Sequence, residues 1–305
     1  MTIGRIAYET WNPNATSLGL IETANRICRE YRQQGYDLTL RQLYYQFVAR
    51  ALIPNNQRSY KTLGTVVDKA RRAGLLDWDY IVDRTRNLAG FRTYDDPAAL
   101  ISEVAERFHM DLWEDQGVRV EVWVEKEALA GVVARAANSR GCNYFSCRGY
   151  VSQSEMHSAA LRHRYYENMG QQMVVLHLGD HDPSGIDMTR DITDRLSLFG
   201  ASTEVHRIAL NLDQISQYAP PPNPAKVTDS RFEGYREIYG DESWELDALD
   251  PATLNNLIVN NIDGFIGWGS FRDRRDLEQR GRDQLTAVSS RWSEVEDLVE
   301  DDLND

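Results

Sequence analysis

The sequence predicts an α/β fold built on a parallel sheet. An apolar run at residues 173–178 is rich in β-branched residues and too short for a typical helix, and in residues 118–127 valines alternate with more polar residues; both patterns favour strands. Glu125 follows the last of these valines, and Asp180 and Asp182 follow the apolar run. Helical patterns lie between and before these runs, so strands and helices alternate along the chain.

The three acids predict a metal site. In extended geometry Asp180 and Asp182 point to the same side, because side chains alternate along a strand. If the two strands are parallel neighbours, Glu125 lies at the same carboxyl edge, where open α/β sheets bind ligands. Converging carboxylates repel one another unless a cation lies among them, and an oxygen-only cluster suits Mg²⁺. The alternative is a solvated turn, with Ser184 capping the helix that follows.

Length and composition limit the classes to which the protein can belong. A chain of 305 residues, 42% hydrophobic and 27% charged, is expected to form two globular domains, 1–112 and 113–305. The first residues lack the pattern of a signal peptide, and no run is long enough to span a membrane. Three cysteines, Cys28, Cys142 and Cys147, fit neither a zinc site nor a disulfide framework. We therefore expect a cytoplasmic protein.

The net charge of −13 argues against nucleic acid as a partner, but the charge is unevenly distributed. Residues 1–90 hold 13 Lys or Arg against 8 Asp or Glu, whereas residues 294–305 hold seven acids and no base. Binding to phosphate depends on the local face, so the first segment remains a candidate for DNA binding. We interpret the acidic end as solvated and partly frayed.

Helical patterns in the first segment predict three short helices. Ser17 and Ser59 are candidate caps of the first and third, and Thr39 begins a T-x-x-Q capping box for the second. With the strand-like segment 78–82, this order resembles a winged helix-turn-helix, whose third helix faces the DNA groove. We expect salt-dependent phosphate contacts, or in the alternative a solvated helix face, from six basic residues: Lys61, Lys69, Arg71, Arg72, Arg84 and Arg86.

Two adjacent tyrosines, Tyr44 and Tyr45, lie in the second predicted helix. Neighbours on a helix point about 100° apart, so we expect only one of them to lie in the core. A phenol has a pKa of about 10 and needs a nearby cation or base to act as a nucleophile. Arg41 lies one turn before Tyr45 and can supply that cation. The alternative for both rings is packing at the boundary of the core.

Together these features resemble a known family. The strand ending in Glu125 and the later strand ending in D-x-D-x-x-G, residues 180–185, resemble the Toprim fold of topoisomerases, primases and some nucleases. With the R-x-x-Y-Y pattern of residues 41–45, the chain is similar to the A subunit of topoisomerase VI and to its relative, the meiotic double-strand-break transesterase. The resemblance covers most of residues 17–250, including the segment 245–249. Compact phage- and plasmid-borne relatives, the mini-A proteins, fit the length best.

The resemblance implies a DNA-cleaving and rejoining enzyme of the isomerase class. Tyr45 would attack DNA to form a 5′-phosphotyrosyl link, with Arg41 beside it and Tyr44 as the alternate nucleophile. The implied Mg²⁺ ligands are Glu125, Asp180 and Asp182. The implied partners are double-stranded DNA, a second copy whose metal site works beside this copy's tyrosine, and an ATPase B-type subunit where one exists. The implied location is the nucleoid, or the host cytoplasm for a phage protein.

Two other classes of function stay open. A Toprim nuclease would use metal-activated water in place of Tyr45. A non-catalytic DNA-binding protein would need neither Tyr45 nor the acids. Elsewhere in the chain, we expect one long C-terminal helix over residues 271–298 and surface positions for His157 and His163.

Overall fold

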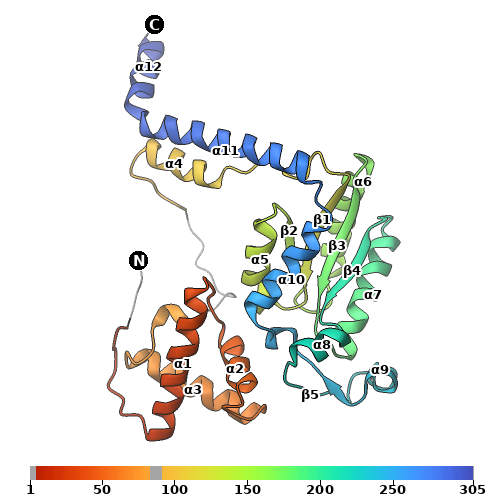
Figure 1. Cartoon of the computed structure of the whole chain (residues 1–305). Helices are drawn as coiled ribbons and strands as arrows, with labels where there is room; N and C mark the ends of the chain where they lie inside the picture. Colours follow the sequence, from red (N-terminus) through yellow and green to blue (C-terminus); the bar gives the residue numbers. More distant parts are fainter. Residues whose placement is uncertain (1–4, 83–90, 305) are drawn as a thin grey trace. The chain divides into compact units, whose positions relative to one another are not determined.

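The computed structural model describes residues 5–82 and 91–304 and has a mixed α/β architecture (Figure 1). The strands are β1 Val118–Val124, β2 Asn143–Ser146, β3 Gln172–Leu178, β4 Glu204–Ala209, β5 Asn223–Pro224 and β6 Glu242–Ser243. The α-helices are α1 Ala15–Gln33, α2 Leu40–Ala49, α3 Gln57–Arg72, α4 Pro97–Arg107, α5 Ala130–Asn138, α6 Gln153–Asn168, α7 Pro183–Leu198, α8 Leu212–Tyr218, α9 Phe232–Tyr239, α10 Pro251–Asp263, α11 Trp268–Ser290 and α12 Trp292–Asn304.

The chain divides into two compact units. The first combines the described parts of residues 1–86 with 120–264 and contains α1 to α3, the sheets and α5 to α10. The second combines the described parts of 87–119 with 265–305 and contains α4, α11 and α12. Each unit is thus assembled from segments that are far apart in the sequence.

The main sheet has four parallel strands in the order β2-β1-β3-β4. Val124 pairs with Ser146 and Leu178 with Ala209, so the strands end at one common edge. The central strands β1 and β3 are buried along nearly their whole length. Burial on both faces explains the apolar run of β3, whereas β1 also carries Arg119 and Glu121, which are buried as well. The prediction of an α/β fold with a parallel sheet is confirmed.

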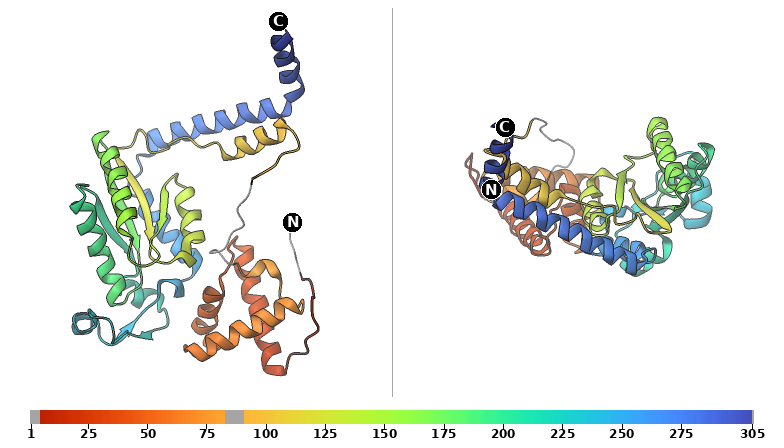
Figure 2. Two further views of the ribbon diagram at one scale, coloured as in Figure 1. Left: turned by 180° about the vertical axis from the view of Figure 1, so that it is seen from behind. Right: turned by 90° about the horizontal axis from the view of Figure 1, so that it is seen from above.

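Helices cover both faces of the sheet (Figure 2). α6 and α7 pack together against β3 and β4, and α5 and α10 pack together on the opposite face. The core between the central strands and α6 and α7 includes Trp123, Val175, Met156, Met188 and Ile192. Burying a large apolar side chain contributes about 1.5–3 kcal/mol, so these contacts hold the strand ends in fixed positions.

A buried glutamate, Glu121, lies in the middle of β1. Arg162 donates two hydrogen bonds to it at 2.7 and 2.9 Å, Trp123 Nε1 donates another at 2.9 Å, and His163 Nε2 lies 3.2 Å away. Burial favours a higher pKa for Glu121, but the hydrogen bonds from His163 and Arg162 outweigh it and hold the pKa well below its ordinary value. His163 is fully buried because its ring bridges Glu121 and Thr203, so its predicted surface position is wrong.

This network predicts a pH-dependent contribution to stability. Glu121→Gln is expected to lower the free energy of unfolding at pH 7 by about 2–3 kcal/mol, because hydrogen bonds to a charged acceptor are lost. A depressed folded pKa contributes stability above the ordinary value of about 4.3 and loses it as pH falls further. Urea unfolding of both proteins from pH 7 to pH 3 should therefore show their difference shrinking with acidity. A difference that stays constant would contradict the charged state of Glu121.

The three N-terminal helices begin at residues that cap them with side-chain oxygens. The capping box at Thr39 is confirmed. The caps predicted at Ser17 and Ser59 are wrong, because Asn14 and Asn56 accept hydrogen bonds from the backbone N–H groups of these serines at 2.8 Å. Each asparagine lies three residues earlier, and asparagine is as strong a cap as serine.

The segment after α3 is not the expected strand. It forms a 3₁₀ turn, Trp78–Tyr80, and Ile81 makes an isolated bridge to Leu38. Arg71 Nη2 donates to the carbonyls of Trp78 and Ile81 at 2.9 and 3.1 Å. These carbonyls are therefore satisfied by an arginine rather than by a neighbouring strand.

In the second unit, α4 packs along α11. Phe108 lies against Gly281, where a Cβ atom would come within 2.4 Å of the phenyl ring. Trp113 and Phe271 meet edge to face with ring centroids 6.2 Å apart. The absence of a side chain at Gly281 thus allows the close approach of the segment that follows α4.

The long helix predicted over residues 271–298 is interrupted. α11 ends at Ser290, Arg291 leaves the helical conformation with φ −117° and ψ 30°, and α12 begins at Trp292. An unbroken apolar stripe therefore does not ensure an unbroken helix. Among the described helices, none combines the length and the apolar character that crossing a membrane requires.

Candidate active site

Glu125 and Asp180 lie together at the carboxyl edge of the sheet. Glu125 follows β1 directly, and its Oε2 accepts a hydrogen bond from the backbone N–H of Asp180 at 2.9 Å. The backbone N–H of Glu125 donates to Leu178 O at 2.8 Å, which continues the pairing of β1 with β3 past the strand ends. Asp180 Oδ1 accepts from the backbone N–H of Leu246 at 2.8 Å. The structure thus brings these two acids into one cluster.

Asp182 begins the next helix. It is the N-cap of α7, and its Oδ1 accepts hydrogen bonds from Gly185 N at 2.6 Å and from Ser184 Oγ at 2.9 Å. The cap predicted at Ser184 is therefore wrong, since Ser184 lies in the first turn and donates to the true cap. Both of these hydrogen bonds end on the same carboxylate oxygen of Asp182.

Gly185 allows the loop between β3 and α7 to close tightly. A Cβ atom at this position would lie 2.2 Å from the backbone oxygen of Asp180. Gly185→Ala is therefore expected to destabilise the protein by about 1–3 kcal/mol and to displace the Asp180 carbonyl. Urea unfolding measures the loss. Gly234→Ala in α9 is the matched control, because nothing lies within 4 Å of its added Cβ and a helical Gly-to-Ala change stabilises by about 0.5–1 kcal/mol. Equal behaviour of the two variants would contradict the account of this loop.

Lys126 lies among three carboxylates. Its Nζ atom is 2.7 Å from Asp180 Oδ2 and 3.2 Å from Asp247 Oδ1, and it forms a third ion pair with Glu245. Glu245 and Asp247 belong to the segment that follows β6. Burial favours a lower pKa for Lys126, but the three carboxylates outweigh it and raise the pKa, so the ammonium group stays charged. Lys126 therefore ties this late segment to the sheet edge.

Arg41 joins α2 to the same cluster. Its Nη2 atom lies 2.8 Å from Glu245 Oε2, and its Nε atom lies 3.0 Å from Asp247 Oδ2. The same guanidinium lies 5.8 Å from the centroid of the Tyr45 ring. An unbroken series of ion pairs thus runs from the tyrosine's helix to Asp180.

Tyr45 lines a pocket with a cavity volume of about 250 Å³, whose walls include Arg41, Asn55, Asn223 and Glu245. Burial raises the pKa of Tyr45 to about 12, and the charges of Glu245 and Asp247 add to the rise, while Arg41 and a hydrogen bond with Asn223 oppose it. The phenol is therefore protonated at neutral pH. It faces an open pocket beside a cation and an acid.

Both tyrosines of the pair are buried. Tyr44 is 4% exposed and Tyr45 is 3% exposed, so the prediction that only one would lie in the core is wrong. The Tyr44 hydroxyl donates to Asn55 Oδ1 at 2.9 Å, and the Tyr44 ring packs edge to face on Tyr60 with centroids 5.3 Å apart. Tyr45 has a hydrogen bond with Asn223, and both tyrosines line the pocket described above.

The acids at the edge are shifted toward their neutral forms. Burial raises the pKa of Glu125, and the charge of Asp182 adds to the rise. Burial also raises the pKa of Asp180 well above its ordinary value, even with Lys126 beside it. Buried carboxylates gain from any further cation that approaches them, so this edge attracts positive charge.

Arg207, on β4, donates hydrogen bonds to the backbone of the acidic loop, which is the loop between β3 and α7 that carries Asp180 and Asp182. Its Nη1 donates to Gly185 O at 2.7 Å, and its Nη2 donates to the carbonyls of Asp180, Gly179 and Leu210 at 2.6, 3.0 and 3.2 Å. Burial lowers the pKa of Arg207, while the nearby Glu125 carboxylate opposes the shift. A single buried guanidinium therefore fixes the backbone that carries the Asp180 side chain.

His181, between the two aspartates, connects the acidic loop to the late segment. Its backbone exchanges two hydrogen bonds with Trp244 at 2.8 and 2.9 Å. Its Nδ1 atom lies 2.8 Å from the hydroxyl of Tyr235, and burial lowers the pKa of His181 to about 4. The ring is therefore neutral at pH 7, and the bridge sets the position of Glu245, the residue after Trp244.

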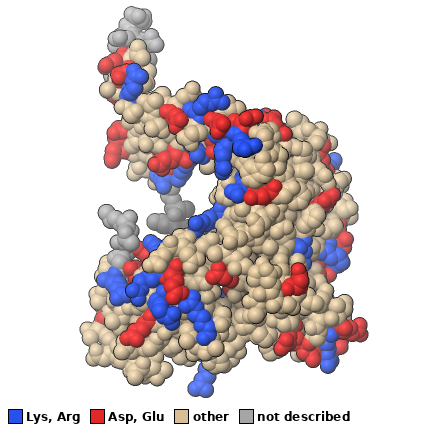
Figure 3. Space-filling view, viewed as in Figure 1, with Lys and Arg blue, Asp and Glu red and all other residues tan. Residues whose placement is uncertain are grey.

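The predicted DNA-contacting residues have different surroundings. Lys61 and Lys69 are exposed on α3, where Figure 3 shows basic and acidic side chains gathered over the N-terminal helices. Arg71 is held by the carbonyls after α3, and Arg72 pairs with Glu9 and Asp68 at 3.0 and 2.8 Å. Arg84 and Arg86 lie outside the described residues. Two exposed lysines on α3 are thus available to bind phosphate.

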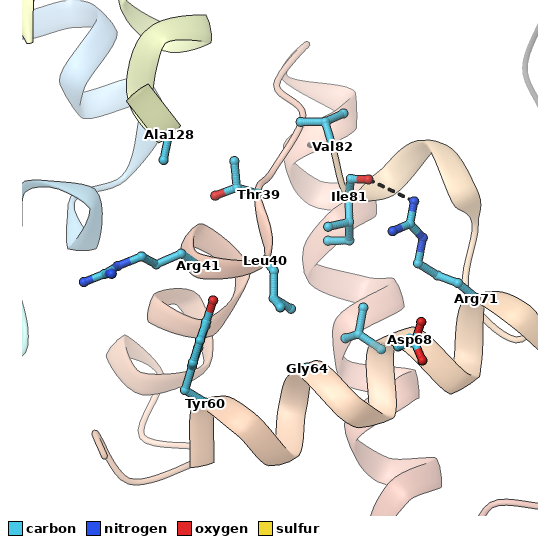
Figure 4. Close-up of a pocket in the computed structure, with 11 residues that line it drawn as sticks. Thr39, Leu40, Arg41, Tyr60, Gly64, Asp68, Arg71, Ile81, Val82 and Ala128 are labelled. Carbon is cyan, nitrogen blue, oxygen red and sulfur yellow. Dashed lines mark hydrogen bonds between the residues drawn. The ribbon is translucent and has the colours of Figure 1, made fainter. Parts of the chain in front are cut away.

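A second hollow of about 380 Å³ lies between α2 and α3 (Figure 4). Leu40 and Ile81 line its apolar side, and Arg71 on its rim donates to Ile81 O. Arg41 extends away from this hollow in Figure 4, so its charged end belongs to the acidic cluster. Its other lining residues include Thr39, Tyr60 and Asp68.

The oxygen donors of the cluster are of the kind that Mg²⁺ requires. The cluster offers only carboxylate oxygens and backbone carbonyls, which are the ligands of this ion. Within residues 5–82 and 91–304, no three His, Cys, Asp or Glu side chains converge on one point as a ready metal site. Lys126 already neutralises part of the cluster, and Arg41 Nε lies 3.0 Å from Asp247 Oδ2. The residue types fit Mg²⁺, while Lys126 holds the position next to Asp180.

Several residues of the cluster were not predicted as site residues. Lys126 follows Glu125 directly, and the charged segment containing Glu245 and Asp247 is visible in the sequence, but nothing local indicates that they meet. Arg207 resembles any arginine on an alternating edge strand. The pairing of β3 with β4 brings Arg207 next to the acidic loop, and no local pattern in the sequence indicates this.

The fold and the cluster define a mixed α/β protein with a buried group of acids and cations at the carboxyl edge of a parallel sheet. No known protein family, no curated protein and no solved structure matches the chain. The function therefore has to be argued from this cluster.

Proposed function

We propose that the protein is a DNA-cleaving transesterase, with Tyr45 as nucleophile and Mg²⁺ at the acidic sheet edge. The observation that carries this proposal is the series of ion pairs from Arg41 through Glu245 and Lys126 to Asp180. It links the helix of the tyrosine to the acids within one chain. Covalent phosphoryl transfer needs a nucleophile and cations beside the phosphate, and this cluster supplies residues for both.

The fold supports the same proposal at the level of domains. We propose that the sheet with α5 to α7 is a Toprim domain and that α1 to α3 form a DNA-binding domain of the winged-helix class. The parallel order of the strands and the acids at their carboxyl ends support the first assignment. The exposed Lys61 and Lys69 on the third helix support the second. The 3₁₀ turn after α3 departs from a winged helix, since a strand is expected there.

In the proposed reaction, the Tyr45 oxygen attacks a backbone phosphorus of DNA. The bond from phosphorus to the 3′ oxygen breaks, leaving a 5′-phosphotyrosyl link and a 3′-hydroxyl. The phenol loses its proton as the 3′ oxygen gains one, so the reaction consumes no other reagent. Reversal reseals the strand without ATP, because the link conserves the energy of the phosphodiester.

The surrounding residues would lower the barrier. Arg41 counters negative charge on the phenolate or on the phosphate. Glu125, Asp180 and Asp182 would hold Mg²⁺, which when bound neutralises charge on the reacting phosphate. Arg207 fixes the loop that carries these aspartates. We propose double-stranded DNA and a second copy of the chain as partners, because two tyrosines are needed to cut both strands, and an ATPase B-type subunit as a further partner.

The test is incubation of the full chain with supercoiled DNA and Mg²⁺, followed by denaturation and analysis of the ends. The proposal predicts cut DNA with protein on its 5′ ends and free 3′-hydroxyls, and no cutting in EDTA. Cut DNA with free 5′ ends would contradict the transesterase. DNA that is bound but never cut would indicate a non-catalytic binding protein.

A metal-dependent nuclease is the second candidate. One observation favours it: Tyr45 carries a raised pKa, which makes the phenol a poor nucleophile, whereas Lys126 lies directly against Asp180, where it could stabilise a hydroxide formed from water. In that case Tyr45→Phe leaves cleavage intact while Asp180→Ala abolishes it.

A further inference from the structure

Lys126 occupies the centre of the acidic cluster. Its side chain is 17% exposed, and its ammonium group contacts Asp180, Glu245 and Asp247. Glu125 adds a fourth carboxylate beside Asp180. An ammonium group is a compact point charge with three donors, so it can satisfy three carboxylates without fixing them in one plane.

The cluster needs this cation when no metal is bound. Four acids lie close together at a buried edge, and like charges at such distances destabilise one another strongly. Arg41 forms ion pairs with Glu245 and Asp247, the outer pair of acids, but not with Asp180. Arg207 donates its hydrogen bonds to backbone carbonyls. Lys126 is therefore the cation that pairs with the carboxylate of Asp180.

We propose that Lys126 is the resident counter-cation of this cluster and that its ammonium group and a divalent cation compete for the same carboxylates. The inference rests on the metal-binding part of the proposed function. The flexible four-carbon stem of lysine lets the ammonium group withdraw without moving the backbone, which a rigid guanidinium could not do as readily. Asp247 Oδ2 lies 3.0 Å from Arg41 Nε, so the outer pair of acids keeps a cation when the ammonium group withdraws.

The competition has two consequences. Without metal, the ammonium group of Lys126 holds the acids together and thereby maintains the ion pairs between Arg41 and the acids. With metal, the ammonium group leaves Asp180, so the carboxylate can bind the ion. Removal of the lysine side chain should therefore lower the stability of the metal-free protein and raise its affinity for the metal.

The test is titration of the full chain with Mg²⁺ by calorimetry, comparing wild type, Lys126→Met and Arg148→Met. Arg148 is the matched control, because its loss also removes one positive charge, but its side chain is 72% exposed and pairs with Glu127 outside the cluster. We expect Lys126→Met to bind Mg²⁺ at least tenfold more tightly than wild type, with a lower melting temperature that Mg²⁺ restores. Arg148→Met should bind Mg²⁺ as wild type does.

A measurement on the wild type keeps the test decisive if Lys126→Met does not fold. The extent of acetylation of Lys126 by an amine-reactive acetylating reagent is measured by mass spectrometry. It should rise several-fold at saturating Mg²⁺, relative to the exposed reference Lys61. Equal Mg²⁺ affinity in wild type and Lys126→Met, or unchanged acetylation at saturating Mg²⁺, would overturn the inference and leave the transesterase intact. Absence of Mg²⁺ binding in every variant would overturn both the inference and the metal-dependent reaction.

Discussion

Tyr45→Phe is expected to abolish covalent capture of DNA while leaving the protein folded. The substitution removes only the hydroxyl group, which faces the pocket beside Arg41 and Glu245, so the packing of the ring is preserved. Without that oxygen no phosphotyrosyl bond can form. The yield of protein-linked 5′ ends should fall to background, and loss of the hydrogen bond with Asn223 should cost about 1 kcal/mol of stability.

Tyr44→Phe is the matched control for this experiment. The Tyr44 hydroxyl donates to Asn55 Oδ1 and Asn56 O, so its loss should cost about 1 kcal/mol of stability. Covalent capture should persist, because this hydroxyl is already committed to structural contacts. Loss of capture in Tyr44→Phe with retention in Tyr45→Phe would transfer the nucleophile to Tyr44.

Arg207→Met is expected to cause a large loss of stability, about 3–5 kcal/mol, since the carbonyls and carboxylates around the guanidinium are left without their cation. Four backbone carbonyls of the acidic loop and of the end of β4 lose their donor. Glu125 and Asp180 lose a nearby positive charge at the same time. Urea unfolding measures the loss, and Mg²⁺-dependent cleavage should also disappear.

The control for Arg207 is an exposed arginine on α7. Arg190 pairs with Asp187 and Asp194, but its side chain is 61% exposed, so Arg190→Met should unfold at nearly the wild-type urea concentration. If Arg207→Met were equally harmless, the guanidinium would not be holding the loop, and the account of the sheet edge would be wrong.

The two central strands were predictable because their patterns are local. β3 is buried on both faces and is an apolar run, and β1 carries valines at alternate positions. The cap at Thr39 was also predictable, because both partners of its capping box lie within four residues. The choice of Asn56 over Ser59 was not, since both residues are good caps and tertiary packing decides which one begins the helix.

The site could be predicted only in part. Glu125 and Asp180 follow the two central strands, and parallel pairing alone brings them together. Lys126 and Asp247 meet across 121 positions of the sequence, and no local pattern encodes such a contact. The burial of His163 has the same origin, because its partner Glu121 lies on another element, 42 positions earlier in the sequence.

The most direct test of the central claim is identification of the residue that carries DNA. Trypsin cleaves after Arg41 and Arg50, so the peptide 42–50 contains both tyrosines of the pair, and fragmentation in a mass spectrometer separates them. After reaction with DNA and Mg²⁺ and nuclease digestion, the account predicts a nucleotide attached to Tyr45. A nucleotide on any other residue, or cut DNA with no modified peptide, would contradict it.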